Sequence, residues 1–329
     1  MSRIPLTLAI SHYDHVTELT SGRVQVEGVD LTPLNLQIEE IFFRMFTYRE
    51  FDASEVSMAK FSSLASQGDS PFVGIPVFPS RVCRHSSIYI RRDGTVKQPS
   101  DLKGKRVGIP EWAQTAAVYS RGLLQHQYGV DLASIQWVQA GVDQPGRQEK
   151  VKLNLPAGID YKPAPDKSLG GMLVSGEIDA ALSAHAPECF EHGHPNVLRM
   201  FPDYLEIEQD YVKQTGIFPI MHAVAIKRAI VERNPWLAAN LFAAFEEAKR
   251  RSVRRALNNT SSALPIPWGY EFARRMQAIT GDELLPYGID ANRTTLEAFL
   301  QYGFEQGVLH KRLKPEDLFP PQVQRSVRV

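Results

Sequence analysis

The sequence predicts an α/β fold of two lobes with a ligand cleft between them. The chain has 329 residues, more than one ordinary domain core needs. Strand-like and helix-like segments alternate along most of it, which is typical of parallel sheets covered by helices. A strand pattern returns at 220–226 after a self-contained stretch, which indicates an inserted lobe. We therefore expect residues 1–92 and 218–329 to form the first lobe and residues 93–217 the second.

The first lobe opens with alternating strand and helix patterns. Short runs rich in β-branched and aromatic residues predict strands, and apolar residues three or four positions apart predict helices. After the first strand the chain is polar, and we expect a loop there up to about residue 35. The predicted strands are 6–10, 52–57, 72–78 and 87–91. The predicted helices are 59–66 and one from near residue 35 that buries Ile38, Ile41, Phe42, Met45 and Phe46.

The second lobe repeats this alternation, and the first lobe then resumes with one strand and several helices. The segment 141–167 is rich in Pro, Gly and charged residues, so we expect it to be irregular. The predicted strands are 107–109, 135–139, 178–183, 197–201 and 220–226. The predicted helices are 116–128, 169–175 and one after Pro235 that runs to about residue 256, with further helices behind it.

Composition and charge exclude several classes of protein. The 37 Lys and Arg residues balance the 37 Asp and Glu residues, so no overall field attracts nucleic acid or an anionic membrane. No apolar run approaches the roughly 20 residues of a membrane span, and the run at 6–10 is too short for a secretory signal. Two distant cysteines, Cys83 and Cys189, indicate a reducing compartment. We therefore expect a soluble cytoplasmic protein that binds neither nucleic acid nor a membrane.

Polar side chains gather where predicted strands end. Because open α/β sheets bind ligands at the carboxyl ends of their strands, we expect one cleft lined by segments 11–15, 55–58, 110–115 and 184–188. His12 and His15 can act as acid or base near neutral pH, and Tyr13 can bond a phenol. In the alternative interpretation these histidines only make hydrogen bonds within their loop. His185, in the last segment, is a further candidate.

A basic cluster precedes the strand predicted at 87–91. Arg81, Arg84 and His85 lie within five residues, and guanidinium groups bind carboxylates bidentately. A solvated basic loop is the alternative interpretation. In an extended segment neighbouring side chains point to opposite sides, so Arg81 and Arg84 are not expected to face the site together.

The turn before the helix at 116–128 contains Trp112, Gln114 and Thr115. Free N–H groups and the positive end of a helix dipole make such a turn an anion site, and Trp112 offers a ring face. A plain helix cap is the alternative for Thr115. His222 lies in the returning strand, where a lone histidine is more often a core residue, but it falls at the expected crossing between the lobes.

Motifs for other chemistries are missing from the sequence. It contains no HExxH, GxSxG, GxxxxGK[ST] or GxGxxG. His192 and His194 are not convincingly framed by a carboxylate or a Cys in metal-ligand spacing. We therefore expect neither a bound metal nor an organic cofactor.

Several segments, in order along most of the chain, resemble the 4,5-dihydroxyphthalate decarboxylases. They are residues 53–60 (ASEVSMAK), 75–86 (IPVFPSRVCRHS), 108–115 (GIPEWAQT), 219–222 (PIMH) and 285–288 (LPYG). Cys83 departs from the pattern, since an apolar or aromatic residue is expected there. The resemblance implies a two-lobed, type II periplasmic-binding-protein-like fold, in agreement with the inserted lobe.

The resemblance also implies a reaction, the conversion of 4,5-dihydroxyphthalate to protocatechuate and CO2. Direct loss of CO2 leaves an aryl carbanion, so protonation at the ipso carbon is expected first, and no cofactor is required. His12 or His222 is then the expected acid. We expect Arg81, Arg84 and His85 to hold a carboxylate, and the other substrate-binding side chains to be Ser57, Trp112, Gln114, Thr115, His185 and Tyr13.

Two other functions fit the same sequence. The fold also suits a solute-binding protein for an aromatic acid, although the density of histidine around the cleft favours an enzyme. A related cytoplasmic enzyme for another hydroxylated aromatic acid is the third interpretation, because pocket shape determines which ring substitution is accepted. In each case the partner is a small aromatic acid, for the decarboxylase a dicarboxylate. The sequence is also compatible with a homo-oligomer.

Overall fold

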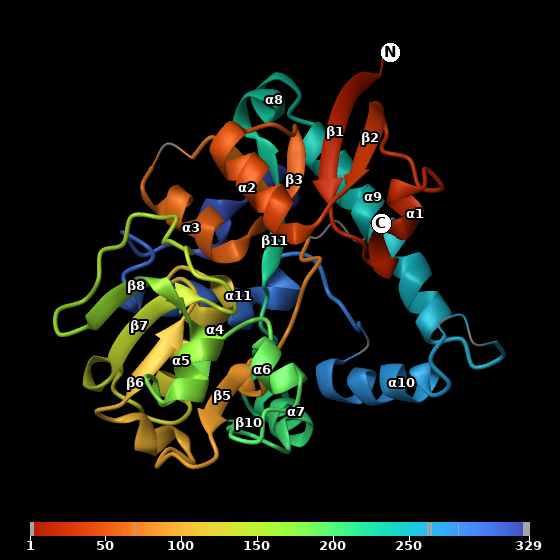
Figure 1. Cartoon of the computed structure of the whole chain (residues 1–329). Coiled ribbons are helices and arrows are strands. Elements are labelled where there is room, and N and C mark those ends of the chain that lie inside the picture. Colours follow the sequence, from red (N-terminus) through yellow and green to blue (C-terminus); the bar gives the residue numbers. More distant parts are fainter. Residues whose placement is uncertain (1–2, 69, 262, 264, 282, 325–329) are drawn as a thin grey trace.

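The protein contains two separate mixed β-sheets, each covered by helices (Figure 1). The computed structural model describes residues 3–324 except 69, 262, 264 and 282. In the first sheet the strand order is β2-β1-β3-β11-β4. Strands β1 to β3 are parallel, and β11 runs antiparallel to both of its neighbours. The bounds are β1 Ile4–Ile10, β2 Val29–Asn35, β3 Ala53–Ser57, β4 Phe72–Ile75 and β11 His222–Lys227.

The second sheet takes all its strands from residues 88–199. Its order is β10-β5-β9-β6-β7-β8, and β5 is antiparallel to both of its neighbours. The other pairs are parallel. The bounds are β5 Ile88–Arg91, β6 Arg106–Ile109, β7 Gln136–Gly141, β8 Asp160–Ser168, β9 Ala180–Leu182 and β10 Val197–Arg199.

Helices follow most of the strands, as the alternating pattern predicts. In the part of the chain that the structure describes, no helix is long and apolar enough to cross a membrane. The bounds are α1 Thr17–Thr20, α2 Ile38–Tyr48, α3 Met58–Ser66, α4 Thr115–His126, α5 Leu169–Ser175, α6 Glu188–Glu191, α7 Tyr204–Thr215, α8 Arg228–Arg233, α9 Leu237–Ala256, α10 Gly269–Thr280 and α11 Arg293–Glu305.

Strand β5 corrects the expected boundary between the lobes. It pairs with β9 and β10 and therefore lies in the second sheet, not among residues 1–92 of the first lobe. A strand pattern shows that a segment is extended but not which sheet it joins. We propose that the inserted lobe begins between residues 76 and 87.

The sequence analysis did not predict two of the strands, β2 and β8. Both lie at an edge of their sheet and carry prolines, Pro33 in β2 and Pro163 and Pro165 in β8. Edge strands tolerate proline because one side of the ladder has no partner to receive an N–H group. Most residues of both strands are partly or fully exposed, so neither shows the apolar pattern of a buried strand.

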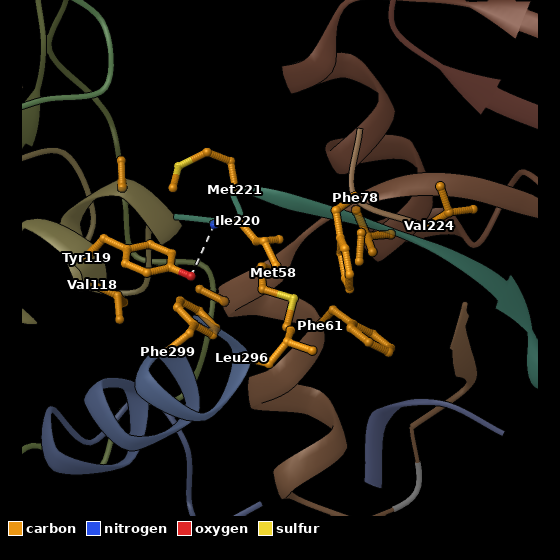
Figure 2. Packing of buried hydrophobic residues seen from close by; sticks show 14 of the residues in the cluster. Met58, Phe61, Phe78, Val118, Tyr119, Ile220, Met221, Val224, Leu296 and Phe299 are labelled. Carbon is orange, nitrogen blue, oxygen red and sulfur yellow. Dashed lines mark hydrogen bonds between the residues drawn. The ribbon is translucent and has the colours of Figure 1, made fainter. Parts of the chain in front are cut away.

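The two lobes share one apolar core where the chain crosses between them (Figure 2). Met58 of α3, Tyr119 of α4 and Phe299 of α11 pack together beside the crossing residue Ile220. The backbone N–H of Ile220 donates to the hydroxyl oxygen of Tyr119 at 3.1 Å. Helix α11 thus attaches the end of the chain to the second lobe through α4.

Candidate active site

Glu55 is the centre of a hydrogen-bonded cluster on the first sheet. It lies in β3, is completely buried, and accepts three hydrogen bonds. The hydroxyl of Tyr13 donates to Oε1 at 2.6 Å, Nδ1 of His222 lies 2.6 Å from the same oxygen, and the backbone N–H of Ser11 donates to Oε2 at 3.1 Å. Loop, strand and returning strand therefore converge on one carboxylate.

The register of the sheet places these groups on one face. Glu55 and Ser57 are two positions apart in β3 and so share a face, and His222 of β11 lies directly opposite Ser57. The segment that crosses between the lobes thereby places His222 beside the end of β3. Sequence analysis proposed His222 for its position at this crossing, and the register explains why that position matters.

Burial and hydrogen bonds within this cluster determine which atoms of Glu55, Tyr13 and His222 carry hydrogen. Burial favours the neutral form of Glu55, but the hydrogen bonds from His222 and Tyr13 outweigh it and hold the pKa of Glu55 below its usual value. Burial and the neighbouring Glu55 raise the pKa of Tyr13, which stays a neutral donor. Because an ionised carboxylate only accepts, Nδ1 of His222 carries hydrogen, and Nε2 is the nitrogen left for chemistry.

A hydroxyl contact joins the lobes beside this cluster. Oγ of Ser57 lies 3.0 Å from Oγ1 of Thr115, which also accepts from the backbone N–H of Ala59 at 3.0 Å. Thr115 is the first residue of α4, yet its side chain bonds to residues of the first lobe instead of capping its own helix. The structure thus brings Ser57 and Thr115 together, as expected of two cleft segments.

A buried ion cluster, which sequence analysis missed, also bridges the lobes. Glu111 is completely buried and lies 3.3 Å from Nζ of Lys60 in α3, 2.7 Å from Arg147 and 3.5 Å from Lys150. Arg147 also pairs with Glu39 of α2 at 3.3 Å. Only the fold brings these charges together, since they come from four separate stretches of chain.

Arg81 serves the structure instead of holding a ligand. Its guanidinium donates to the carbonyl oxygens of Phe218 at 3.3 Å and Pro286 at 2.7 Å, and also to Oδ1 of Asn292. Burial lowers the pKa of Arg81 to about 10, so it remains a cation near neutral pH. With its terminal nitrogens bound to the protein, Arg81 does not fit the expected carboxylate clamp.

Arg84 still has an N–H group that can donate a hydrogen bond to a ligand. It is 7% exposed, and its partners are Oγ of Ser87 at 3.4 Å and the thioether of Met221 at 2.6 Å. Burial lowers the pKa of Arg84 to about 10. Among the described residues no carboxylate lies within ion-pair distance of it. The two arginines of the cluster thus differ in environment, and the role of Arg84 in the site stays a prediction.

His85 does not fit the role in the carboxylate clamp that was expected for it. It is 1% exposed and its ring lies within 6.0 Å, centre to centre, of Tyr128, Phe201 and Tyr211. Neither ring nitrogen has a hydrogen-bond partner. Burial lowers the pKa of His85 to about 4, so the ring is neutral and enclosed. The sequence pattern could not show that aromatic rings from three other segments of the chain would cover it.

Trp112 is a core residue and offers no ring face to a ligand. It is fully buried, and the guanidinium of Arg121 covers its ring at 3.9 Å. The anion site predicted at this turn is filled by the protein itself, because Glu149 accepts from the N–H groups of Trp112 at 2.6 Å and Ala113 at 3.2 Å. Gln114 stays a candidate, since its buried Oε1 has no partner.

The remaining histidines differ in environment. His12 and His185 are exposed, and no described residue hydrogen-bonds to either ring. His15 is buried, which lowers the pKa of its ring to about 4. Among the described residues no three His, Cys, Asp or Glu side chains gather in a way that could hold a metal ion. Of the histidines proposed for the site, His222 is thus the one that the fold pairs with a carboxylate.

Solved structures share this fold at low sequence identity. The periplasmic aliphatic sulphonate binding protein SsuA of Escherichia coli matches with a TM-score of 0.53 at 13% identity, covering 97% of this chain and 98% of its own. The desulfurization enzyme DSZB matches with a TM-score of 0.50 at 14% identity, covering 97% of each chain. The predicted periplasmic-binding-protein-like fold is therefore confirmed.

No family model matches the chain. A curated relative aligns with it over its whole length. The 4,5-dihydroxyphthalate decarboxylase of Comamonas testosteroni is 36% identical over 330 residues, which cover 100% of both chains. The protein of the same name from Pseudomonas putida is 42% identical over 204 residues, 62% of this chain and 79% of its own. The predicted resemblance is confirmed, and the chain belongs to the 4,5-dihydroxyphthalate decarboxylase family.

Proposed function

We propose that the protein is a carboxy-lyase that converts 4,5-dihydroxyphthalate to protocatechuate and CO2 in phthalate degradation. The relative from Comamonas testosteroni, which carries this activity in its name, aligns with the whole chain. The Glu55–His222 pair at the lobe crossing is the observation on which the chemistry rests. A buried carboxylate that orients an imidazole is a common arrangement for proton transfer.

His222 acts as the acid in this proposal. Nε2 gives its proton to the ring carbon that bears the leaving carboxylate, while the hydroxyl para to that carbon loses its proton and becomes a carbonyl. The bond to the carboxylate then breaks, its electron pair restores the aromatic ring, and CO2 leaves. The oxygen takes a proton back, so the net change is one proton from solvent in place of CO2. Glu55 stabilises the imidazolium before transfer, and Tyr13 holds Glu55 in place.

The test is incubation of the purified protein with 4,5-dihydroxyphthalate in D2O. We expect equal amounts of CO2 and protocatechuate, with one deuterium on the carbon that lost the carboxylate. Binding of the compound without turnover would instead support the solute-binding alternative. Turnover of a differently hydroxylated phthalate in preference would support the related-enzyme alternative.

We also propose that the protein acts in the cytoplasm. Cys83 and Cys189 are both free thiols, which suits a reducing compartment. Fractionation of cells that express the chain would test this location. A homo-oligomer remains a prediction, for which light scattering of the purified protein is the test.

A further inference from the structure

Ser87 lies beside the guanidinium of Arg84, and Ser183 is joined to Ser87 through the backbone. Strands β5 and β9 pair Ile88 with Leu182, and just beyond this pair the N–H of Ser183 donates to the carbonyl of Ser87 at 3.1 Å. Ser87 and Ser183 therefore occupy opposite positions of the chain next to the ends of β5 and β9. A terminal nitrogen of Arg84 reaches Oγ of Ser87 at 3.4 Å.

These groups are buried but incompletely paired. Arg84 is 7% exposed and Ser183 is 2% exposed, yet neither Nε of Arg84 nor Oγ of Ser183 has a partner. The nearby carboxylate of Glu208 accepts from the backbone N–H and the hydroxyl of Ser86 instead, both at 2.9 Å. Buried polar groups in proteins are nearly always hydrogen-bonded, so a buried guanidinium with an unpaired N–H and no carboxylate partner among the described residues is suited to bind an anion.

We propose that Arg84, Ser87 and Ser183 form the subsite for the carboxylate that the substrate keeps. This inference rests on the proposed decarboxylation. It assigns a binding site to one of the two carboxylates of the substrate. A carboxylate that leaves as neutral CO2 loses its charge, so charge-assisted hydrogen bonds to it would stabilise the ground state more than the transition state. The cation therefore suits the carboxylate that stays ionised throughout.

The subsite selects ligands that carry a carboxylate. A carboxylate can accept hydrogen bonds from Arg84 and Ser183, whereas a neutral aromatic ligand leaves them buried and unpaired. The resulting difference in affinity is large, because a ligand without the carboxylate not only loses a contact but also leaves buried polar groups unpaired.

The test uses phthalate, which lacks the para hydroxyl that activates the ring and so binds without turnover. Isothermal titration of the wild-type protein should show phthalate binding at least tenfold more tightly than benzamide, which has no carboxylate. Arg84→Lys and Ser183→Ala should each weaken phthalate binding by about 10- to 150-fold. Both variants should bind benzamide as the wild type does, because benzamide has no carboxylate for the subsite.

Ser62→Ala is the matched control. Ser62 is also fully buried with an unpaired hydroxyl, but it lies in α3, away from Arg84. It should leave phthalate binding unchanged, and the melting temperatures of both serine variants should stay at or above that of the wild type.

The outcomes separate the subsite from the reaction. Equal binding of phthalate and benzamide by the wild type, or unchanged phthalate binding by Ser183→Ala and Arg84→Lys, would overturn the subsite even if the protein decarboxylates. Weakened phthalate binding in a protein that does not turn over 4,5-dihydroxyphthalate would retain the subsite and reject the reaction.

Discussion

Nδ1 of His222 lies 2.6 Å from Oε1 of Glu55, a carboxylate that solvent does not reach. The two residues are 167 positions apart, and the antiparallel pairing of β11 with β3 brings them together. The imidazole keeps 14% of its side-chain surface exposed, and its edge meets the ring of Phe42 at 5.0 Å. An oriented, partly accessible imidazole is what an ipso protonation requires.

His222→Gln should lower kcat by about 100- to 10,000-fold, the usual contribution of a general acid. Phthalate affinity should change little, because the proton donor acts on the transition state. His12→Gln is the control and should keep wild-type turnover, since His12 is exposed and unpaired in the described structure. Steady-state kinetics decides between the two histidines. Loss of turnover in His12→Gln alone would transfer the acid role to His12.

Glu55→Gln should also lower kcat, by about 100- to 10,000-fold. The amide keeps the size of the side chain but removes the charge that stabilises the imidazolium, as in catalytic triads. Tyr13→Phe removes one of the three hydrogen bonds to Glu55 and should have a smaller effect. Single-turnover kinetics of both variants, with circular dichroism to verify folding, measures this order. Equal effects would mean that Tyr13 itself takes part in the reaction.

Glu111→Gln should destabilise the protein by about 3–5 kcal/mol, because it leaves Lys60 buried without its counter-charge. Urea unfolding followed by fluorescence gives the free energy. Asp210→Asn, which breaks the exposed pair with Lys213, is the control and should cost less than about 1 kcal/mol. A Glu111→Gln variant as stable as this control would show that the cluster does not hold the lobes together.

His85 should make stability depend on pH. Its pKa is lowered to about 4 in the folded protein against about 6.5 in an unfolded chain, so the unfolded state binds more protons between these values. Stability should therefore fall as pH drops from about 6.5 to 4, with a slope of about 1.4 kcal/mol per unit from this residue.

His85→Phe should remove that part of the slope and fit the surrounding aromatic rings. His192→Phe, at an exposed position, is the control and should leave the slope unchanged. Unfolding titrations at several pH values measure both slopes. An unchanged slope in His85→Phe would mean that the ring is protonated without cost in the folded protein.

Turnover should survive removal of metals by dialysis against a chelator. In the proposed reaction the proton comes from His222 and the product is neutral CO2, so no step needs a Lewis acid. The measurement is kcat before and after dialysis, with metal content verified by mass spectrometry. Loss of activity that one divalent ion restores would contradict the prediction.

The sequence by itself determined the architecture. Alternation of strand and helix patterns depends on neighbours a few residues apart, so most strands and helices could be predicted within a few residues. Of the four segments expected at one cleft, hydrogen bonds join 11–15 to 55–58 and 55–58 to 110–115, whereas none among the described residues joins 184–188 to them. The edge strands β2 and β8 could not be predicted, since proline and solvent exposure obscure their pattern.

The tertiary structure decided the role of each side chain within those segments. His222 and His85 look alike in sequence, but one faces the Glu55 carboxylate and the other is enclosed by aromatic rings. Arg81 is bound by the carbonyls of distant loops, while Arg84 is left without a counter-ion. Protonation and binding capacity depend on burial and on partners more than a hundred residues away. Only strand pairing and lobe packing determine those partners.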